Sequence, residues 1–304
     1  MKTERQAYFL LLLVIVLWGV NWPIMKYGLQ YISPLWFTSI RLLLGSSFLF
    51  VLLAIQGRLK LPVRNDVPAV LIVAILQFTV AFGLMHMALT AVEAGRSAIL
   101  AYTTPLWVTP MAIVVLGERI SLAKGAGLVL GVFGLGVLFN PAAFDMTDRD
   151  QVIGNVMLIG SAVALAVVIV QNRHHKFIAT PLQLMPWQML LGGLILTIVA
   201  LIFEGLPEIP VNGPILAILA YNGPIASAFC LWAYATIMRS LPATSTAFGS
   251  LGVPVVGMLV SAVALDESLG GDKILGLALI SGGVGIMVFA DLRQKRRRSK
   301  AEAT

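Results

Sequence analysis

The residues of this chain that could bind a ligand are polar and aromatic side chains set within long apolar runs. They are amides, hydroxyls, one imidazole and aromatic rings, and none is a carboxylate. Such groups suit a small amphipathic molecule, because an apolar wall with a few aimed polar groups fixes a ligand's orientation. The candidates for substrate binding are Trp18, Asn21, Gln77, His86, Tyr102, Tyr221, Asn222, Thr246 and Ser250.

The motifs that carry enzymatic chemistry are missing from the sequence. There is no GxxxxGK[ST] for nucleotide phosphates, no GxSxG and no HExxH, and the apolar runs hold no paired carboxylates. The adjacent His174 and His175 lie in a basic segment without carboxylate or cysteine partners, which makes a poor metal site. We therefore expect no enzyme, no cofactor and no metal. A membrane enzyme or a scaffolding subunit is the alternative, and it would need one indispensable catalytic side chain.

The elements that position these residues are apolar stretches of membrane-spanning length. The 304 residues are 59% hydrophobic and 12% charged, whereas a soluble domain is about 45–50% apolar and about 25% charged. A bilayer core needs roughly 20 apolar residues per helix, which predicts an all-α polytopic membrane protein and excludes a disordered or nucleic-acid-binding chain. The ten predicted spans are 7–27, 34–55, 67–90, 95–117, 123–140, 152–171, 182–203, 213–237, 243–265 and 272–290.

The distribution of basic residues predicts an orientation. With an even number of spans, 16 of the 21 Lys and Arg residues fall on the side of both termini and four on the other, while Arg41 lies inside a span. Positive residues favour the cytoplasm, so both termini are expected there. The basic run from Arg293 to Lys300 is then a topology signal and an anchor to anionic lipid. A tail that binds nucleic acid or a partner is the alternative.

The two halves of the chain resemble each other. Residues 33–45 (SPLWFTSIRLLLG) align with 180–192 (TPLQLMPWQMLLG) at an offset of 147, and later pairs such as Pro105 with Pro254 align at 149. This predicts two five-helix repeats, 1–145 and 146–291, followed by a basic tail, 292–304. Because five is odd, the second repeat must be inverted, which suits alternating access. A duplication that only builds a symmetric scaffold is the alternative.

These motifs resemble the drug/metabolite transporter superfamily, specifically its ten-helix EamA-type carriers. The resemblance covers 7–290 and rests on LWGVNWPIMKYGL (17–29), SPLWFTSIRLLLG (33–45), LGERIS (116–121) and LDESL (265–269). Within the superfamily the chain is similar to YddG-type amino-acid exporters.

That resemblance implies an exporter of small amphipathic metabolites, amino acids among them, in a bacterial inner membrane. It also implies a central cavity lined by the first, third, fourth, sixth, eighth and ninth helices. A flippase for a lipid or lipid-linked sugar, and a multidrug or nucleobase exporter, are the alternatives.

Prolines and glycines mark expected bends and close contacts. Pro105, Pro110 and Pro254, with Gly249, predict gating bends in the fourth and ninth spans, or static kinks. The GxxxG beginning at Gly127 predicts close helix packing within a monomer, with a dimer face as the alternative.

Charged residues near the membrane are expected to have structural roles. We expect Arg41 to snorkel to the headgroups or to pair with Glu93. Glu118 and Glu267 are helix-end acids that cap the next helix or hold a loop. For His86 a hydrogen-bonded packing role is favoured over proton coupling.

Overall fold

The computed structural model describes residues 4–117, 121–138, 147–210, 212–240 and 251–302, and every regular element among them is a helix. Two uninterrupted helices, α1 (Glu4–Gly28) and α2 (Pro34–Ile55), open the chain. The third span combines α3 (Val67–Ile72), η1 (Val73–Ala81) and α4 (Phe82–Ala91), and the fourth combines two shorter helices. These are α5 (Ala94–Ala101) and α6 (Thr104–Leu116), followed by α7 (Leu122–Leu138).

The second half repeats this plan. The long helices α8 (Arg149–His174) and α9 (Pro181–Phe203) are followed by a composite span. The remaining helices are α10 (Gly213–Ala220), η2 (Tyr221–Phe229), α11 (Cys230–Ser240), α13 (Gly252–Ala264) and α14 (Gly271–Glu302). Among the described residues, eight helices are long and apolar enough to cross a bilayer, and Leu122–Leu138 and Gly252–Ala264 are shorter apolar helices. The all-α polytopic membrane fold is confirmed.

The third and eighth spans each contain a π-helical segment of nine residues, η1 and η2. Tyr221 lies 148 residues after Val73, so the two segments occupy corresponding places in the two halves. In each segment a side-chain hydroxyl donates to the carbonyl five residues earlier: Thr79 Oγ1 to the Ala74 carbonyl at 3.0 Å, and Ser227 Oγ to the Asn222 carbonyl at 2.7 Å. Because π-helix is rare and is found mostly at functional sites, these segments draw attention to the third and eighth spans.

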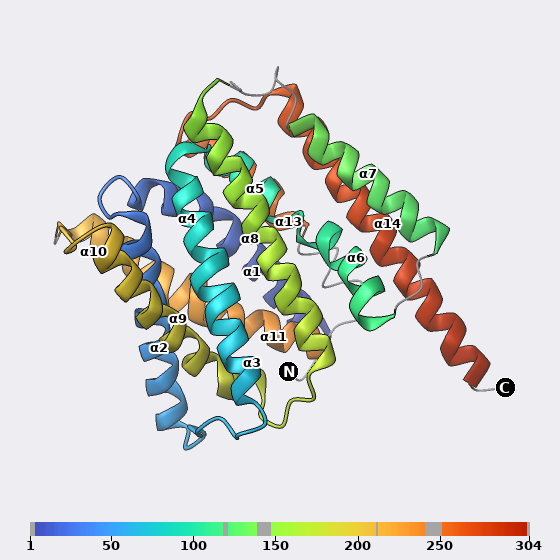
Figure 1. Ribbon diagram of the computed structural model, residues 1–304, viewed down its shortest axis with the longest axis horizontal. Coiled ribbons are helices and arrows are strands. Elements are labelled where there is room, and N and C mark those ends of the chain that lie inside the picture. The colour runs from blue at the N-terminus through green and yellow to red at the C-terminus, as the bar shows by residue number, and fades with distance from the viewer. Residues whose placement is uncertain (1–3, 118–120, 139–146, 211, 241–250, 303–304) are drawn as a thin grey trace.

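Helices at corresponding places in the two halves pack against each other. The second span (α2) packs on the seventh (α9), the fifth (α7) on the tenth (α14), and the fourth (α5) on the ninth (α13). The sixth helix, α8, contacts the third and fourth spans, and α1 makes the corresponding contacts with the eighth and ninth. Figure 1 shows α7 and α14 side by side along one edge, with the C-terminal end of α14 extending past the bundle.

Glycines allow the backbones of α7 and α14 to touch. A Cβ on Gly127 would lie 2.6 Å from the Gly283 carbonyl oxygen, and one on Gly134 would lie 2.7 Å from Leu279 Cβ. The expected GxxxG contact is thus formed within the chain.

The fourth span is broken near its prolines. Helix α5 ends at Ala101, and α6 begins at Thr104 with Pro105 in its first turn, where the missing N–H costs nothing. Pro110 lies inside α6, and Pro254 lies near the start of α13. Gly249 lies outside the described residues.

Candidate functional site

Two of the aromatic candidates join α1 to the eighth span. Trp18 Nε1 donates to the Ala226 carbonyl at 2.9 Å, and the Tyr221 hydroxyl donates to the Leu17 carbonyl at 2.7 Å. The Trp18 ring also lies against Tyr234, with centroids 5.3 Å apart. Because these side chains contribute polar contacts between two helices that face the bundle interior, they tie α1 to η2.

The two candidate asparagines lie on the same pair of elements and are both buried. Asn21 is 4% exposed and Asn222 is fully buried. Asn222 Nδ2 donates to the Ile218 carbonyl at 3.1 Å. Within the part of the chain that the structure describes, neither Oδ1 atom has a hydrogen-bond partner. A buried acceptor without a donor is costly, so these two oxygens are suited to receive N–H groups from a ligand.

A buried polar cluster forms around Arg41, which is 3% exposed. Its Nη1 lies 3.1 Å from His86 Nε2 and 2.9 Å from Met25 Sδ. Its Nε and Nη2 both donate to Ser227 Oγ, at 3.1 and 2.9 Å. The guanidinium also lies 5.6 Å from the centroid of the Phe82 ring. Arg41 of α2 therefore contacts α1, α4 and η2 together.

This arrangement corrects the expectation for Arg41. The side chain does not snorkel to the headgroups, because it is buried among three other spans. It does not pair with Glu93 either, since Glu93 forms an ion pair with Lys273. The sequence position of Arg41 within the second span indicated a place near one face of the membrane, but the helices packed around it bury its side chain.

The hydrogen bonds of His86 define its tautomer. His86 Nδ1 lies 2.8 Å from the Phe82 carbonyl, which can only accept, so Nδ1 carries the proton. Nε2 then presents its lone pair to Arg41 Nη1. The imidazole is therefore a neutral acceptor within this cluster, in agreement with a hydrogen-bonded packing role.

The remaining candidates are more scattered. Gln77 is half-buried in η1, and Tyr102 is half-buried at the break between α5 and α6. Tyr102 packs against the main hydrophobic core. Thr246, Ser250 and Glu118 lie outside the described residues.

Charged side chains join several helices at one end of the bundle, where α1 and α4 end and α5, α8 and α14 begin; we call this the Glu267 end. The Glu267 carboxylate accepts the backbone N–H groups of Ala94 and Gly95 at 2.6 and 2.8 Å. It thus caps α5, a helix distant in sequence. Lys26 Nζ donates to three carbonyls at the end of α4, those of Leu89, Thr90 and Val92.

A second group of contacts strengthens the Glu267 end. Arg96 donates to Asn155 Oδ1 at 2.8 Å and to the Leu138 carbonyl, and lies 3.9 Å from Asp272. Lys273 pairs with Glu93. Together these contacts hold the ends of α1, α4, α5, α7, α8 and α14 and the loop between α13 and α14 against one another.

Two acids missed by the sequence analysis bind backbone N–H groups at or just before the start of a helix in the opposite half. Glu204, after α9, accepts from Ser33 Oγ and from the backbone N–H groups of Leu35 and Trp36 at the start of α2. Asp66, before α3, accepts from the N–H groups of Ile178 and Ala179 just before α9.

The environment of Asp66 perturbs its ionisation. Burial acts to raise the pKa of Asp66, but the backbone donors of Ala179 and Ile178 and the ring of His175, 3.1 Å away, outweigh burial and hold this pKa below its usual value. The ionised carboxylate is therefore part of the folded structure. An alignment of the two halves could not find this pair of acids, because they do not occupy corresponding positions.

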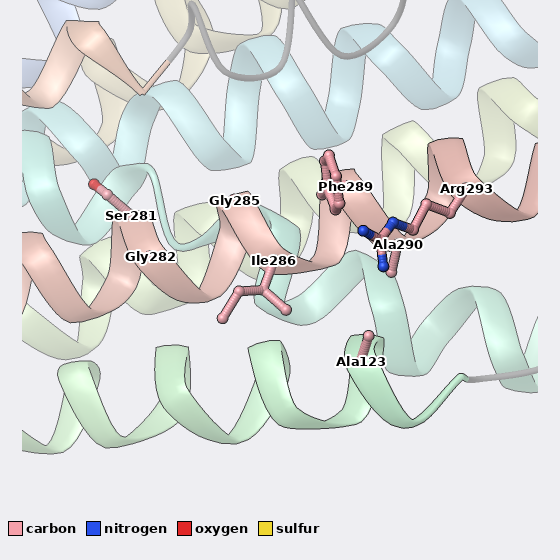
Figure 2. A pocket seen from close by; sticks show the side chains of 8 residues that line it. All are labelled: Ala123, Ser281, Gly282, Gly285, Ile286, Phe289, Ala290 and Arg293. Carbon is pink, nitrogen blue, oxygen red and sulfur yellow. The ribbon is translucent and has the colours of Figure 1, made fainter.

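Two surface hollows lie away from the Arg41 cluster. A groove of about 370 Å³ lies on α14 beside the start of α7 (Figure 2) and is lined by Ala123, Ser281, Gly282, Gly285, Ile286, Phe289, Ala290 and Arg293. A hollow of about 580 Å³ at the Glu267 end is lined by residues of α4, the start of α2 and the start of α8.

Comparisons with known proteins give consistent results. The model of the EamA-like transporter family matches residues 5–140 and 152–289. Two relatives, each 26% identical, are an uncharacterized transporter, YoaV, of Bacillus subtilis (93% of this chain, 96% of its own) and a probable amino-acid metabolite efflux pump of Escherichia coli (94% and 96%). A crystal structure with 22% identity shares the fold, with a TM-score of 0.67 over 94% of this chain and 98% of its own.

Proposed function

The chain belongs to the EamA-like transporter family, and from this premise we propose that it is an alternating-access exporter of small amphipathic metabolites, including aromatic amino acids. Two relatives are named probable amino-acid metabolite efflux pumps. An apolar bundle with buried amides, a guanidinium and aromatic rings suits such a solute.

The observation that carries this proposal is the matched pair of π segments. They lie at corresponding places in the third and eighth spans, and one of them, η2, holds Asn222 and also Ser227, which contacts Arg41. A π segment can shift its register more easily than an α-helix because its hydrogen-bond geometry is already irregular. Each half of the carrier contains one such segment, which gives it a place to bend.

We assign the halves to 1–145 and 146–291, related by inversion. The two matches to the family model and the offset of 148 between η1 and η2 support this division. The Glu267 end is then the closed, outer end of the carrier, because charged contacts tie six helices together there.

We further propose that the multi-pass chain lies in a bacterial inner membrane with both termini in the cytoplasm. Transport needs neither a cofactor nor a chemical step, and the carrier acts as a monomer in the bilayer. Reporter fusions at each terminus test the orientation, and termini on opposite sides would refute the inverted repeat.

The decisive test is counterflow in liposomes that contain the purified protein. Vesicles loaded with unlabelled phenylalanine should accumulate labelled phenylalanine transiently and saturably, and protein-free vesicles should not. A folded protein that exchanges no amino acid would refute the substrate class. Lipid-linked sugar scrambling in the same vesicles would favour the flippase.

A further inference from the structure

We propose that Arg41 is the residue that binds the carboxylate of the transported solute. The inference rests on the proposed carrier function and deepens it, since it states which chemical group the solute must carry. It depends on the contacts of the guanidinium, its burial and the charges around it.

Within the part of the chain that the structure describes, the Arg41 guanidinium contacts only neutral groups. The acceptors are the Ser227 hydroxyl, the His86 imidazole and the Met25 thioether. Among the described residues, no carboxylate lies within ion-pair distance of it. A buried cation without an anion is expensive, because the low-dielectric interior does not replace its hydration.

Two other buried cations of the bundle differ in this respect. Arg96 is 3% exposed and has Asp272 beside it, and Lys273 is 4% exposed and pairs with Glu93. At these two sites, where the cation joins helices, the fold provides a carboxylate. At Arg41 it provides weak, neutral acceptors, which a carboxylate can displace because a charge-assisted bidentate pair is stronger.

The acceptors around Arg41 come from the spans expected to line a transport path. Met25 belongs to α1, His86 to α4 and Ser227 to η2. Ser227 Oγ also donates to the Asn222 carbonyl of the same π segment at 2.7 Å. A carboxylate that takes the guanidinium from Ser227 would thus act directly on the π segment, which links binding to a conformational change.

A second group of atoms suits the other end of an amino acid. Asn21 lies four residues before Met25, so the two side chains share a face of α1. Asn222 belongs to the same segment as Ser227, and the Oδ1 atoms of both asparagines are buried and have no partner among the described residues. An ammonium group supplies the N–H donors that these oxygens lack.

The repeat offers an internal comparison for the role of the charge. Arg41 aligns with Gln188 of α9, which is uncharged and half-buried. The fold therefore accommodates glutamine at the corresponding place in the second half. Arg41→Gln removes the charge and the planar fork while it retains a polar, though shorter, side chain.

The test is competition in the counterflow assay with solutes that differ only in the carboxylate. In wild-type vesicles, unlabelled phenylalanine should compete with labelled phenylalanine, whereas phenylalaninamide and 2-phenylethylamine should compete at least about 10-fold more weakly. Arg41→Gln should lower the apparent affinity for phenylalanine by about 10- to 100-fold, as expected for lost charge-assisted hydrogen bonds. It should also abolish the discrimination against the amide.

Two controls separate this inference from simpler effects. Gln188→Ala, at the aligned position, should leave both affinity and discrimination unchanged, and Arg41→Lys, which keeps the charge but not the fork, should give an intermediate affinity. If Arg41→Gln does not fold, ligand-induced thermal stabilisation of the wild type supplies the test, with phenylalanine stabilising it more than phenylalaninamide.

The outcomes distinguish the inference from the proposed function. Wild-type protein that exchanges phenylalanine and phenylalaninamide equally overturns the role of Arg41 and leaves the carrier intact. The same conclusion follows if Arg41→Gln transports with unchanged affinity and discrimination. Wild-type protein that exchanges no amino acid overturns both.

Discussion

Removing the charge of Glu267 should open the Glu267 end of the carrier. The carboxylate accepts two backbone N–H groups at the start of α5, at 2.6 and 2.8 Å, and it is carried by the loop between α13 and α14. In Glu267→Gln only one oxygen remains, and the new amide group is a donor that faces a donor. One of the two hydrogen bonds is therefore lost and the other becomes neutral.

The magnitude follows from these contacts. Losing one hydrogen bond to a charged group costs about 1.5–3 kcal/mol, and losing a negative charge at a helix N-terminus costs a further 0.3–1 kcal/mol or so. Because Glu267 is half-exposed, we take about 2 kcal/mol, near the lower end. If the contact exists only while this end is closed, the population of the open state rises by about 30-fold.

Cysteine accessibility measures this change directly. The chain has one cysteine, Cys230, which is buried, so Cys230→Ser supplies a cysteine-free background. Ser97→Cys then places a reporter on α5 at a fully buried position. An impermeant maleimide added from outside the cell should label it about 10- to 30-fold faster when Glu267→Gln is also present. Glu208→Gln, an exposed acid between α9 and α10, is the matched control.

The reasoning is refuted if Glu267→Gln and Glu208→Gln label at the same rate. Labelling that is faster from the cytoplasmic side instead would show that Glu267 lies at the inner end and that the proposed orientation is inverted.

Three further predictions test packing, ionisation and the aromatic candidates. Gly283→Ala should destabilise the protein by about 1–3 kcal/mol, because the new Cβ would lie 2.5 Å from a backbone oxygen of α7. Gly136→Ala is the control, since the space around Gly136 is open and the substitution should cost nothing. Thermal unfolding in detergent compares the two variants. Asp66→Asn should lower the unfolding midpoint at pH 7. Because the pKa of Asp66 is lower in the folded state, the difference in unfolding midpoint between wild type and Asp66→Asn is complete above the unfolded-state pKa and should shrink below about pH 4. A difference in midpoint that stays constant down to about pH 3 would contradict this. Trp18→Ala and Tyr102→Ala should each weaken phenylalanine competition by about 2- to 10-fold, as lost aromatic contacts do, and all-or-none loss in a folded variant would instead indicate a catalytic residue.

Most of the predicted spans agree closely with the helices, because crossing a bilayer is a requirement on local composition; of 243–265, residues 243–250 lie outside the described residues. The predicted span 34–55 has the bounds of α2, and 182–203 differs from α9 by one residue at its start. An apolar run of the right length must form a helix in lipid to satisfy its own backbone groups. Close packing at the GxxxG beginning at Gly127 was also predictable, because small residues at helical spacing let a neighbouring backbone approach, but the sequence did not indicate that the partner is α14.

The π segments show where sequence reasoning stops. Periodicity did not indicate them, since nine residues are too few to reveal a change of helical period. Their hydroxyl partners, Thr79 and Ser227, look like ordinary polar residues in an apolar run. Once the structure has shown the two π segments, their separation of 148 residues shows that they occupy corresponding places in the repeat.

Arg41 shows the same division more sharply. The sequence by itself determined that a cation lies inside the second span, that its aligned partner is uncharged, and that the chain is an all-α membrane protein of the EamA-like family. Only the tertiary structure decided that this cation meets Ser227, 186 residues away, and His86, 45 residues away, rather than Glu93 or the headgroups. The reason is physical: a bilayer acts on each helix alone, so composition encodes its position, whereas the partner of a buried charge depends on which helices pack around it.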